Sequence, residues 1–431
     1  MPMSTVAALN ALEILDSRGR PTVSATCRLS SGASASVSIP SGASTGQAES
    51  RELRDGDPKR YRGLGCRKAV ANVNGEIARA VVGESFENQA VLDQALIHLD
   101  GTPNKARLGS NAVLAVSLVF ARAVAEERRV PLYLHFASLL GQEPRTLPRL
   151  TINLLSGGKH AGGQVAIQDV LMVPASSTSI DESLAMAYDV YQAAAELVER
   201  RYGMRLLTAD EGGLAPPCES ADAMIETAVE AIAAAGYRPG ADVAIAIDVA
   251  ASHFYAGGCY HLDGEVLSSD EMIARVQNWL RRFPILSVED VLAEEDWDHW
   301  PKLRAAIENK ARVVGDDLLC TNPARIRRAV AARACNTLLL KVNQIGTLSE
   351  ALTALQMARS AGWQVTASAR SGETEDHWLA DLAAGWSADQ IKVGSITQSD
   401  RLAKYNRLLT IETETAWRVR PFQAQSESSG Q

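Results

Sequence analysis

Short apolar runs recur through the second half of the chain, and each run ends in a charged or polar residue. A helical pattern of apolar positions follows each of them. The runs occupy residues 243–248, 285–290, 312–317, 337–344, 363–370 and 390–394. Their spacing of roughly 20–40 residues is typical of a strand–helix unit. Runs that are apolar on both faces suit parallel strands covered by helices. Six consecutive units predict an α/β barrel more than an open sheet.

The first part of the chain has a different pattern. Residues 22–29 alternate apolar and polar positions as a half-buried strand does, and residues 35–39 follow a Ser-Gly turn as its hairpin partner. A helix with a Ser cap is predicted over 110–129. Residues 141–148 contain two prolines and no periodicity, which predicts a linker. We therefore expect an α+β domain over 1–140, a barrel domain over 146–420 and a disordered tail over 421–431.

Composition narrows the class of protein. The net charge of -8 argues against nucleic acid as the main partner, because a phosphate backbone binds to a basic face. No apolar run reaches 18 residues, so no membrane span is expected. The N-terminus lacks the pattern of a signal peptide. The six cysteines form no CxxC pair, which favours a reducing compartment such as the cytoplasm.

Ionisable residues stand at the ends of the predicted strands, where barrel enzymes carry their active sites. Asp248, Glu289 and Asp316 end three different runs, and their hard oxygen ligands suit Mg²⁺. Each acid taken alone is equally typical of a helix N-cap or a solvated loop. The adjacent acids Asp290 and Asp317 leave open which member of each pair points inward.

Cationic residues end the next three runs. Lys341 follows an apolar run, and metal cations near a buried amine would lower its pKa and make it a base. A structural salt bridge is the alternative. Arg370, Ser371 and Lys392 together suit an anionic group such as phosphate, although Arg370 alone is as typical of a surface ion pair.

The sequence also offers a candidate general acid and two candidate mobile loops. Glu211 lies in the glycine- and proline-rich segment 209–217 and suits protonation of a departing hydroxyl, or is simply a solvated turn acid. Loops 41–45 and 156–163 are polar and glycine-rich, as lids are. Ser44 is placed to offer a hydroxyl to a second metal ion, and His160 to reach a substrate phosphate.

The chain resembles the enolase family nearly end to end. The matching stretches are EILDSRGRPTV (13–23), PSGASTG (40–46), ELRDGD (52–57), LDGTPNK (99–105), DEGG (210–213), SVED (287–290), GDDL (315–318), LLLKVNQIGTLSE (338–350), RSGETED (370–376), QIKVGS (390–395) and DRLAKYNRLL (400–409). The resemblance implies an enolase-type fold, with an N-terminal α+β domain and a modified (βα)8 barrel whose first strands are irregular. It also implies a homodimer or higher homo-oligomer that uses Mg²⁺ to dehydrate 2-phosphoglycerate to phosphoenolpyruvate, a step of glycolysis.

The resemblance assigns roles to individual residues. It implies a first Mg²⁺ on Asp248, Glu289 and Asp316 and a second that meets Ser44. Lys341 matches the base for the C2 proton, and Glu211 matches the acid for the C3 hydroxyl. The positions that match contacts to the substrate are His160, Gln168, Asp169, Arg370, Ser371 and Lys392.

Three positions depart from the family pattern. Ala369 replaces a histidine, Asp169 replaces a glutamate, and Val393 stands where threonine is usual. Three hypotheses follow. The first is an enolase with weakened activity. The second is a related dehydratase for a bulkier phosphonate, such as carboxyphosphonoenolpyruvate synthase of phosphonate natural-product biosynthesis. The third is a non-catalytic binding protein, against which the retained acids and lysines argue.

Overall fold

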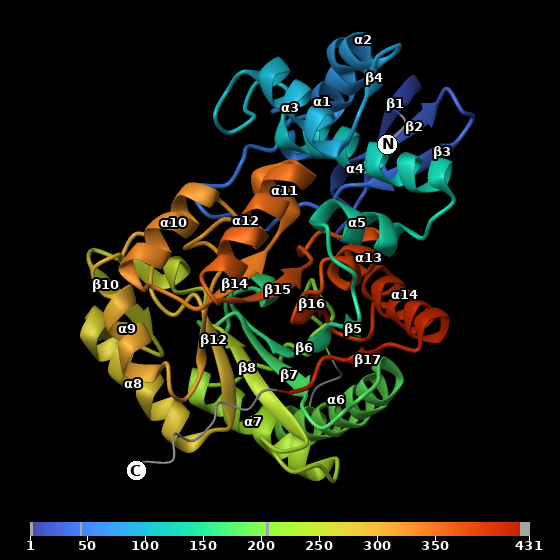
Figure 1. The fold of residues 1–431 in the computed structure, drawn as a ribbon. Coiled ribbons are helices and arrows are strands. Elements are labelled where there is room, and N and C mark those ends of the chain that lie inside the picture. The colour runs from blue at the N-terminus through green and yellow to red at the C-terminus, as the bar shows by residue number, and fades with distance from the viewer. Residues whose placement is uncertain (1–2, 44, 204–206, 423–431) are drawn as a thin grey trace.

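The first part of the chain forms an antiparallel sheet packed against helices. The computed structural model describes residues 3–43, 45–203 and 207–422 (Figure 1). Four strands pair in the order β3-β2-β1-β4, with the bounds β1 Ser4–Leu15, β2 Pro21–Leu29, β3 Ser34–Ser38 and β4 Ser85–Phe86. Ala25 lies opposite Val37, which confirms the predicted hairpin. From Val23 onward, buried residues of β2 alternate with more exposed ones, as the sequence pattern predicts for a half-buried strand.

Five α-helices and a π-helical turn cover this sheet or extend beyond it. Their bounds are α1 Arg67–Asn72, the π turn Val73–Ile77, α2 Ala78–Val81, α3 Gln89–Asp100, α4 Ser110–Arg128 and α5 Leu132–Leu140. The expected serine cap of α4 is wrong, because Gly109 occupies the cap position and no side chain caps the helix. Gly109 has φ 96°, and a Cβ there would lie 2.5 Å from Leu53 Cβ. The close approach of the neighbouring segment therefore requires glycine.

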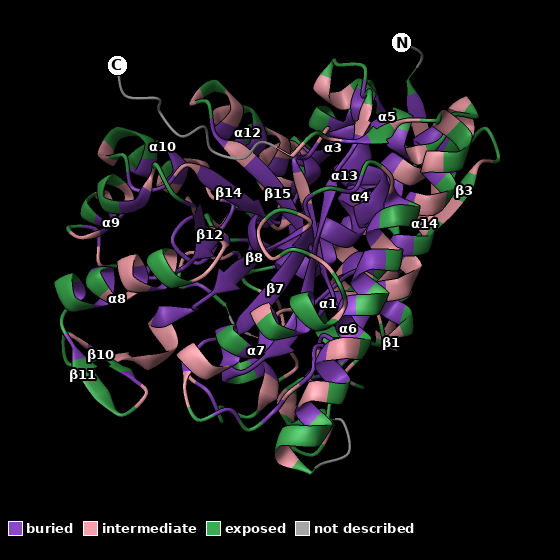
Figure 2. Cartoon of the chain, turned by 90° about the horizontal axis from the view of Figure 1, so that it is seen from below, coloured by how far each residue is buried: buried purple, intermediate pink, exposed green. Residues whose placement is uncertain are grey.

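The second part of the chain closes into an eight-stranded barrel. Its strands are β6 Arg149–Ser156, β7 Asp169–Pro174, β8 Val243–Asp248, β12 Ile285–Glu289, β13 Arg312–Gly315, β14 Thr337–Leu340, β15 Gln364–Ser368 and β16 Gln390–Gly394. They pair around the ring in the order β12-β13-β14-β15-β16-β6-β7-β8. Only β7 runs antiparallel to its neighbours, which confirms the expected irregular start of the barrel. The strands form the buried centre of the molecule (Figure 2).

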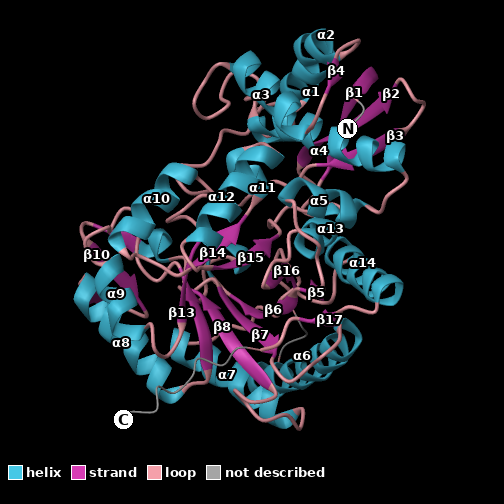
Figure 3. Ribbon diagram, viewed as in Figure 1, coloured by secondary structure: helices cyan, strands magenta, loops and turns pink. Residues whose placement is uncertain are grey.

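Helices surround most of the barrel (Figure 3). They are α6 Ile180–Tyr202, α7 Ala221–Ala234, α8 Ser269–Arg282, α9 Trp300–Ile307, α10 Pro323–Ala332, α11 Val342–Ile345, α12 Leu348–Ser360, α13 Trp378–Gly385 and α14 Ser399–Thr415. A small sheet of β9 Tyr255–Ala256, β10 Cys259–Leu262 and β11 Glu265–Leu267 lies between β8 and α8 along the chain. Several N-terminal caps are supplied by side chains, as at Ser268 of α8. None of the helices in the described ranges is both long and apolar enough to cross a bilayer.

The predicted linker over 141–148 is only partly irregular. It contains β5 Thr146–Leu147, which pairs in parallel with β17 Arg418–Val419 near the C-terminus. Of the predicted tail, Pro421 and Phe422 are described, and the Arg149 guanidinium lies 5.7 Å from the centre of the Phe422 ring. Residues 423–431 lie outside the described part of the chain.

Candidate active site

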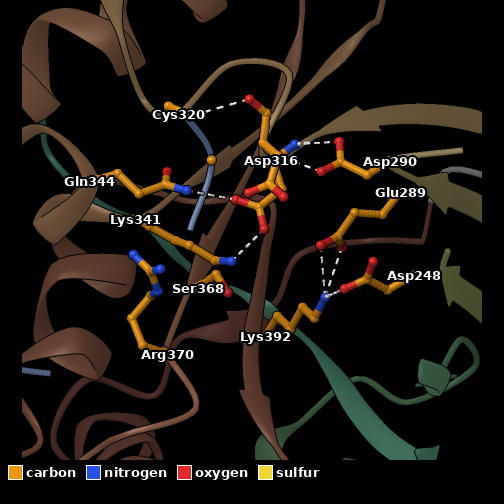
Figure 4. A network of polar contacts seen from close by, with 12 residues as sticks. Asp248, Glu289, Asp290, Asp316, Cys320, Lys341, Gln344, Ser368, Arg370 and Lys392 are labelled. Carbon is orange, nitrogen blue, oxygen red and sulfur yellow. Dashed lines mark hydrogen bonds and ion pairs between the residues drawn. The ribbon is translucent and has the colours of Figure 1, made fainter. Parts of the chain in front are cut away.

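The carboxyl ends of the barrel strands bring the predicted acids and lysines together (Figure 4). Asp248 and Glu289 are the last residues of adjacent strands and lie opposite each other in the sheet. Asp316 follows β13, and Lys341 follows β14. Lys392 lies inside β16 and not at its end as expected, although its side chain still joins this group. Parallel pairing places these positions at one edge of the barrel.

Lys392 joins two of the predicted metal ligands. Its Nζ atom donates to Asp248 Oδ2 at 2.8 Å and to Glu289 Oε2 at 2.8 Å. Burial opposes the charged form of Asp248, but Lys392 outweighs it and lowers the pKa of Asp248 to about 2. Burial and the charge of Asp248 raise the pKa of Glu289 well above its usual range. One ammonium group is therefore insufficient to neutralise this pair of carboxylates.

Asp316 lies within a second group of polar contacts. The Lys341 amine donates to its Oδ2 atom, and Gln344 Nε2 donates to its Oδ1 atom at 2.8 Å. Burial opposes the charge on Lys341, but Asp316 and Glu289 outweigh it, so the pKa of Lys341 is raised. This direction belongs to the metal-free chain, in which Asp316 is the first-named source of attraction. The lowering expected from nearby metal cations stays a prediction.

Asp290 has different partners from its neighbour Glu289. Its Oδ1 and Oδ2 atoms accept the backbone N–H groups of Asp316 and Asp317, at 3.0 and 2.7 Å. The residue has φ 44°, in the left-handed region that L side chains rarely adopt. Asp290 therefore holds the backbone, while Glu289 and Asp316 contact the lysines. Burial and the charge of Asp316 raise the pKa of Asp317 to about 8.

The donor atoms fit a hard divalent cation. Asp248, Glu289 and Asp316 offer only oxygen, and the Gln168 Oε1 atom beside them is buried without a hydrogen-bond partner. Within the described residues, two other groups have ligand atoms within 4.8 Å of one another, namely Asp290–Asp316–Asp317 and His160–Asp169–Glu211. Asp248, Glu289 and Asp316 do not form such a group among the described residues. Asp248 and Glu289 contact Lys392, and Asp316 contacts Lys341. The metal ligands therefore stay a prediction.

The predicted acid Glu211 lies in a buried cluster with His160. Asn153 Nδ2 donates to Glu211 Oε2 at 3.0 Å, and His160 Nε2 is 3.7 Å from Glu211 Oε1. The other ring nitrogen of His160 is 3.1 Å from Asp169 Oδ2, and Ser156 Oγ donates to Asp169 Oδ1 at 2.5 Å. Asp169 thus contacts the histidine and the strand β6.

The charges in this cluster favour a protonated imidazole. Burial opposes the charge of His160, but Glu211 and Asp169 raise its pKa to about 9. Burial raises the pKa of Asp169 further than His160 lowers it. Burial also acts to raise the pKa of Glu211, but His160 and nearby cations outweigh it, and this pKa is lowered. These two shifts favour a proton on the histidine of the Glu211–His160 pair.

A small cavity of about 10 Å³ opens among these groups. It is lined by His160, Gln168, Glu211, Asp248, Lys341, Ser368, Ala369, Arg370, Ser371, Lys392 and Val393. Lys341 and Glu211, the predicted base and acid, both line it. Asp169 is buried completely and is not among the lining residues, so it contacts the cavity through His160.

Arg370 is buried and paired, not on the surface. Its two terminal nitrogens lie 3.0 and 3.1 Å from the carboxylate oxygens of Glu49, and Nη1 also donates to Asn343 Oδ1 at 3.0 Å. Ser371 Oγ accepts the backbone N–H of Ala43 at 3.1 Å. Ser44 lies outside the described residues. Sequence reasoning did not find Glu49, Asn153 or Gln344, because no local pattern marks a residue whose partner is far along the chain.

The fold and the site together define a class of protein. Its members are α/β barrels in which acids and lysines meet at the carboxyl ends of the strands, next to an N-terminal α+β part of the chain. Comparison with known protein families then identifies the family within this class. The family described as "Enolase, N-terminal domain" matches residues 6–136, and "Enolase, C-terminal TIM barrel domain" matches residues 144–427. The chain belongs to the enolase family.

Proposed function

We propose that this chain is a cytoplasmic, Mg²⁺-dependent hydro-lyase that dehydrates 2-phosphoglycerate or a close analogue. The observation that carries this proposal is the position of Lys341 and the Glu211–His160 pair, which line one cavity together with Asp248. Elimination of water from a 2-substituted 3-hydroxy acid needs a base for the C2 proton and an acid for the C3 hydroxyl. Both types of group are present here on separate side chains.

Lys341 is the proposed base. In the free chain its amine is bound to Asp316, so it accepts a proton only once that contact is relieved. Magnesium held by Asp248, Glu289 and Asp316 would stabilise the negative charge that develops on the substrate carboxylate. A cation held by Asp316 would also lessen the attraction that raises the pKa of Lys341.

We assign the departing hydroxyl to the Glu211–His160 pair as a unit. The pKa of Glu211 is lowered and that of His160 is raised, so the imidazole would supply the proton that Glu211 needs to act as an acid. Asn153 holds the Glu211 carboxylate, and Asp169 holds the His160 ring. Arg370, Ser371 and Lys392 line the cavity and would bind the anionic groups of the substrate.

The direct test follows the absorbance of the enol product after 2-phosphoglycerate and Mg²⁺ are added to the full chain. We expect turnover that chelation by EDTA abolishes. If neither 2-phosphoglycerate nor a phosphonate analogue yields product under these conditions, the third hypothesis, an enolase-like binding protein, replaces this proposal.

Ala369 favours a second candidate substrate. Its small side chain lines the cavity where the family has histidine, and Val393 lies beside it in the lining. A bulkier substrate, such as the carboxylated phosphonate of carboxyphosphonoenolpyruvate synthase, would use that space. Losing one transition-state contact costs about 2–4 kcal/mol with the ordinary substrate.

The Ala369→His variant separates the two candidates. If the cavity serves 2-phosphoglycerate, restoring the ring should raise kcat/KM for this substrate by about tenfold or more. If the cavity serves the bulkier phosphonate, the added ring should abolish turnover of that substrate. Comparing kcat/KM for both substrates in wild type and variant decides between them.

A further inference from the structure

Glu49 enters the candidate active site from the N-terminal part of the chain. Its carboxylate accepts from both terminal nitrogens of Arg370, at 3.0 and 3.1 Å. Both side chains are almost fully covered, with exposed fractions of 7% and 3%. A guanidinium held through two parallel N–H···O contacts has a fixed plane and a fixed position. Arg370 is therefore oriented by a residue 321 positions away along the chain.

The same carboxylate also holds the segment that precedes it. Glu49 Oε1 accepts the backbone N–H of Gly46 at 3.1 Å. This segment contacts the barrel at two further points, through the bond from Ala43 N to Ser371 Oγ and through the bond from Gln47 N to Glu294 Oε2 at 2.9 Å. Gly46 is tightly enclosed, because a Cβ at this position would meet Cys320 Sγ at 2.4 Å. Ala43, Gly46 and Gln47 thus pack closely against the loops that follow the barrel strands.

A third contact links Glu49 to the predicted metal ligands. Gln344 Nε2 lies 3.3 Å from Glu49 Oε1 and 2.8 Å from Asp316 Oδ1. Gln344 is fully buried, and Thr321 Oγ1 donates to its Oε1 atom at 2.8 Å, which fixes the orientation of the amide. One carboxylate therefore contacts the loop, the substrate-binding arginine and the amide that holds Asp316.

We propose that Glu49 is a positioning residue that makes the anion-binding geometry of Arg370 depend on the packing of Ala43, Gly46 and Gln47 against the barrel. The inference rests on the proposed function, since it concerns the same site. Glu49 itself does not line the cavity within the described part of the chain, so it acts through Arg370 and not on the substrate. Its loss removes one carboxylate acceptor from the buried Arg370 guanidinium and one acceptor each from Gly46 N and Gln344 Nε2.

The test uses the full chain with the Glu49→Gln variant and two measurements that need no turnover. Hydrogen–deuterium exchange of peptides covering 40–49 should become about tenfold faster or more, because a neutral amide replaces a charge-assisted acceptor. Calorimetric titration with inorganic phosphate in the presence of Mg²⁺ should show affinity about tenfold weaker or more. Unchanged exchange and unchanged phosphate affinity would overturn the proposal.

Two control variants isolate the role of Glu49. Glu350→Gln removes another ion pair between the two parts of the chain, Lys105 Nζ to Glu350 Oε1 at 2.8 Å, without touching Arg370. It should leave both measurements unchanged. Glu49→Asp keeps the charge and should recover part of the phosphate affinity. If Glu350→Gln has the same effect as Glu49→Gln, general loosening of the domain contact explains the result and the proposal is wrong.

A double variant shows whether Glu49 acts through Arg370. In an Arg370→Gln background, adding Glu49→Gln should weaken phosphate binding less than twofold further, whereas independent effects would multiply. If the effects of the two substitutions on phosphate affinity multiply, the proposal is wrong. With substrate, Glu49→Gln should raise KM about tenfold while kcat stays within about threefold. An inactive wild-type chain with the expected exchange and phosphate responses would overturn the proposed dehydration and still support the role of Glu49.

Discussion

Lys341 shows how a single residue depends on its surroundings. It follows an apolar strand and is bound by Asp316, so the same carboxylate that would hold a cation controls the basicity of the amine. The sequence shows that Lys341 follows a buried strand, but only the folded chain shows which charge is nearest. The proposed role in proton abstraction follows from this contact and from the position of the amine in the cavity wall.

Replacing Lys341 with Ala should slow exchange of the substrate C2 proton with D2O by about a hundredfold to ten-thousandfold, because the general base is lost. Proton NMR of the substrate C2 signal in D2O with Mg²⁺ measures this rate. Lys310→Ala, at an exposed lysine, is the matched control and should exchange at the wild-type rate. Exchange that persists in Lys341→Ala would assign the base to another residue.

His135 is a buried residue outside the site whose protonation should affect stability. It lies on α5 with an exposed fraction of 3%, and neither ring nitrogen has a hydrogen-bond partner. Burial, with a smaller contribution from Arg128, lowers its pKa from 6.5 to about 4. The unfolded chain therefore binds a proton near pH 6.5 that the folded chain binds only near pH 4. The free energy of unfolding should fall as the pH drops through this window.

Between pH 7.5 and pH 5, His135 should account for about 2 kcal/mol of lost stability. His135→Leu should remove that part of the pH dependence, which denaturant unfolding at the two pH values measures. His98→Gln, at an exposed position of α3, should leave the pH dependence as it is. If wild type and His135→Leu lose the same free energy of unfolding between the two pH values, His135 is not the source of this pH dependence.

At the scale of elements, the ends of the neighbouring strands β12 and β13 are connected by hydrogen bonds. Asp290, just after β12, accepts the backbone N–H groups of Asp316 and Asp317, just after β13. The connection fixes where Asp316 points and explains the left-handed φ of 44° at Asp290. The strain is offset by the two buried hydrogen bonds that Asp290 accepts from backbone N–H groups.

Asp290→Asn should weaken Mg²⁺ binding about tenfold to a hundredfold, because an amide replaces one of the two acceptors and presents an N–H group to a backbone donor. Calorimetric titration with MgCl2 gives the affinity. Asp298→Asn, at an exposed acid in the segment before α9, serves as the control. An Asp290→Asn chain that binds Mg²⁺ as tightly as wild type would show that this backbone contact does not shape the metal ligands.

The sequence predicted some barrel strands and not others. The six apolar runs each contain a barrel strand, because parallel strands joined by helices repeat at a regular spacing. The strands β6 and β7 were not predicted. They pair antiparallel and are joined by the loop 157–168 without an α-helix, so the strand–helix repeat is absent there. The inward residues Asn153 and Ser156 of β6 were missed for the same reason.

At the scale of the whole molecule, buried carboxylates should couple metal binding to stability. The pKa of Glu289 is raised well above its usual range and that of Asp317 is raised to about 8, both through burial and neighbouring acids. A cation beside them should therefore stabilise the folded chain, by about 2.7 kcal/mol at a Mg²⁺ concentration one hundred times the Kd. Thermal unfolding with MgCl2 and with EDTA measures the shift. Equal Tm values in the two conditions would mean that no such site exists.

The assembly state can be tested at the same scale. The enolase family and the apolar residues Leu12 and Leu15 on β1, each more than half exposed, lead us to propose a homodimer. Sedimentation equilibrium should give twice the mass of the chain, and Leu12→Glu with Leu15→Glu should reduce it. A single-chain mass for wild type at micromolar concentration would rule out a stable dimer.

The sequence by itself determined the two kinds of structure, six of the eight barrel strands and the residue types at the ends of these strands. Periodic burial and turn residues are local, and the ordered motifs carry the family. The tertiary structure alone decided the pairings, such as Glu49 with Arg370 and Lys392 with Asp248 and Glu289. These contacts span 321, 144 and 103 positions along the chain. Closure of the barrel determines which strand ends meet, and with them the charge that each buried group experiences.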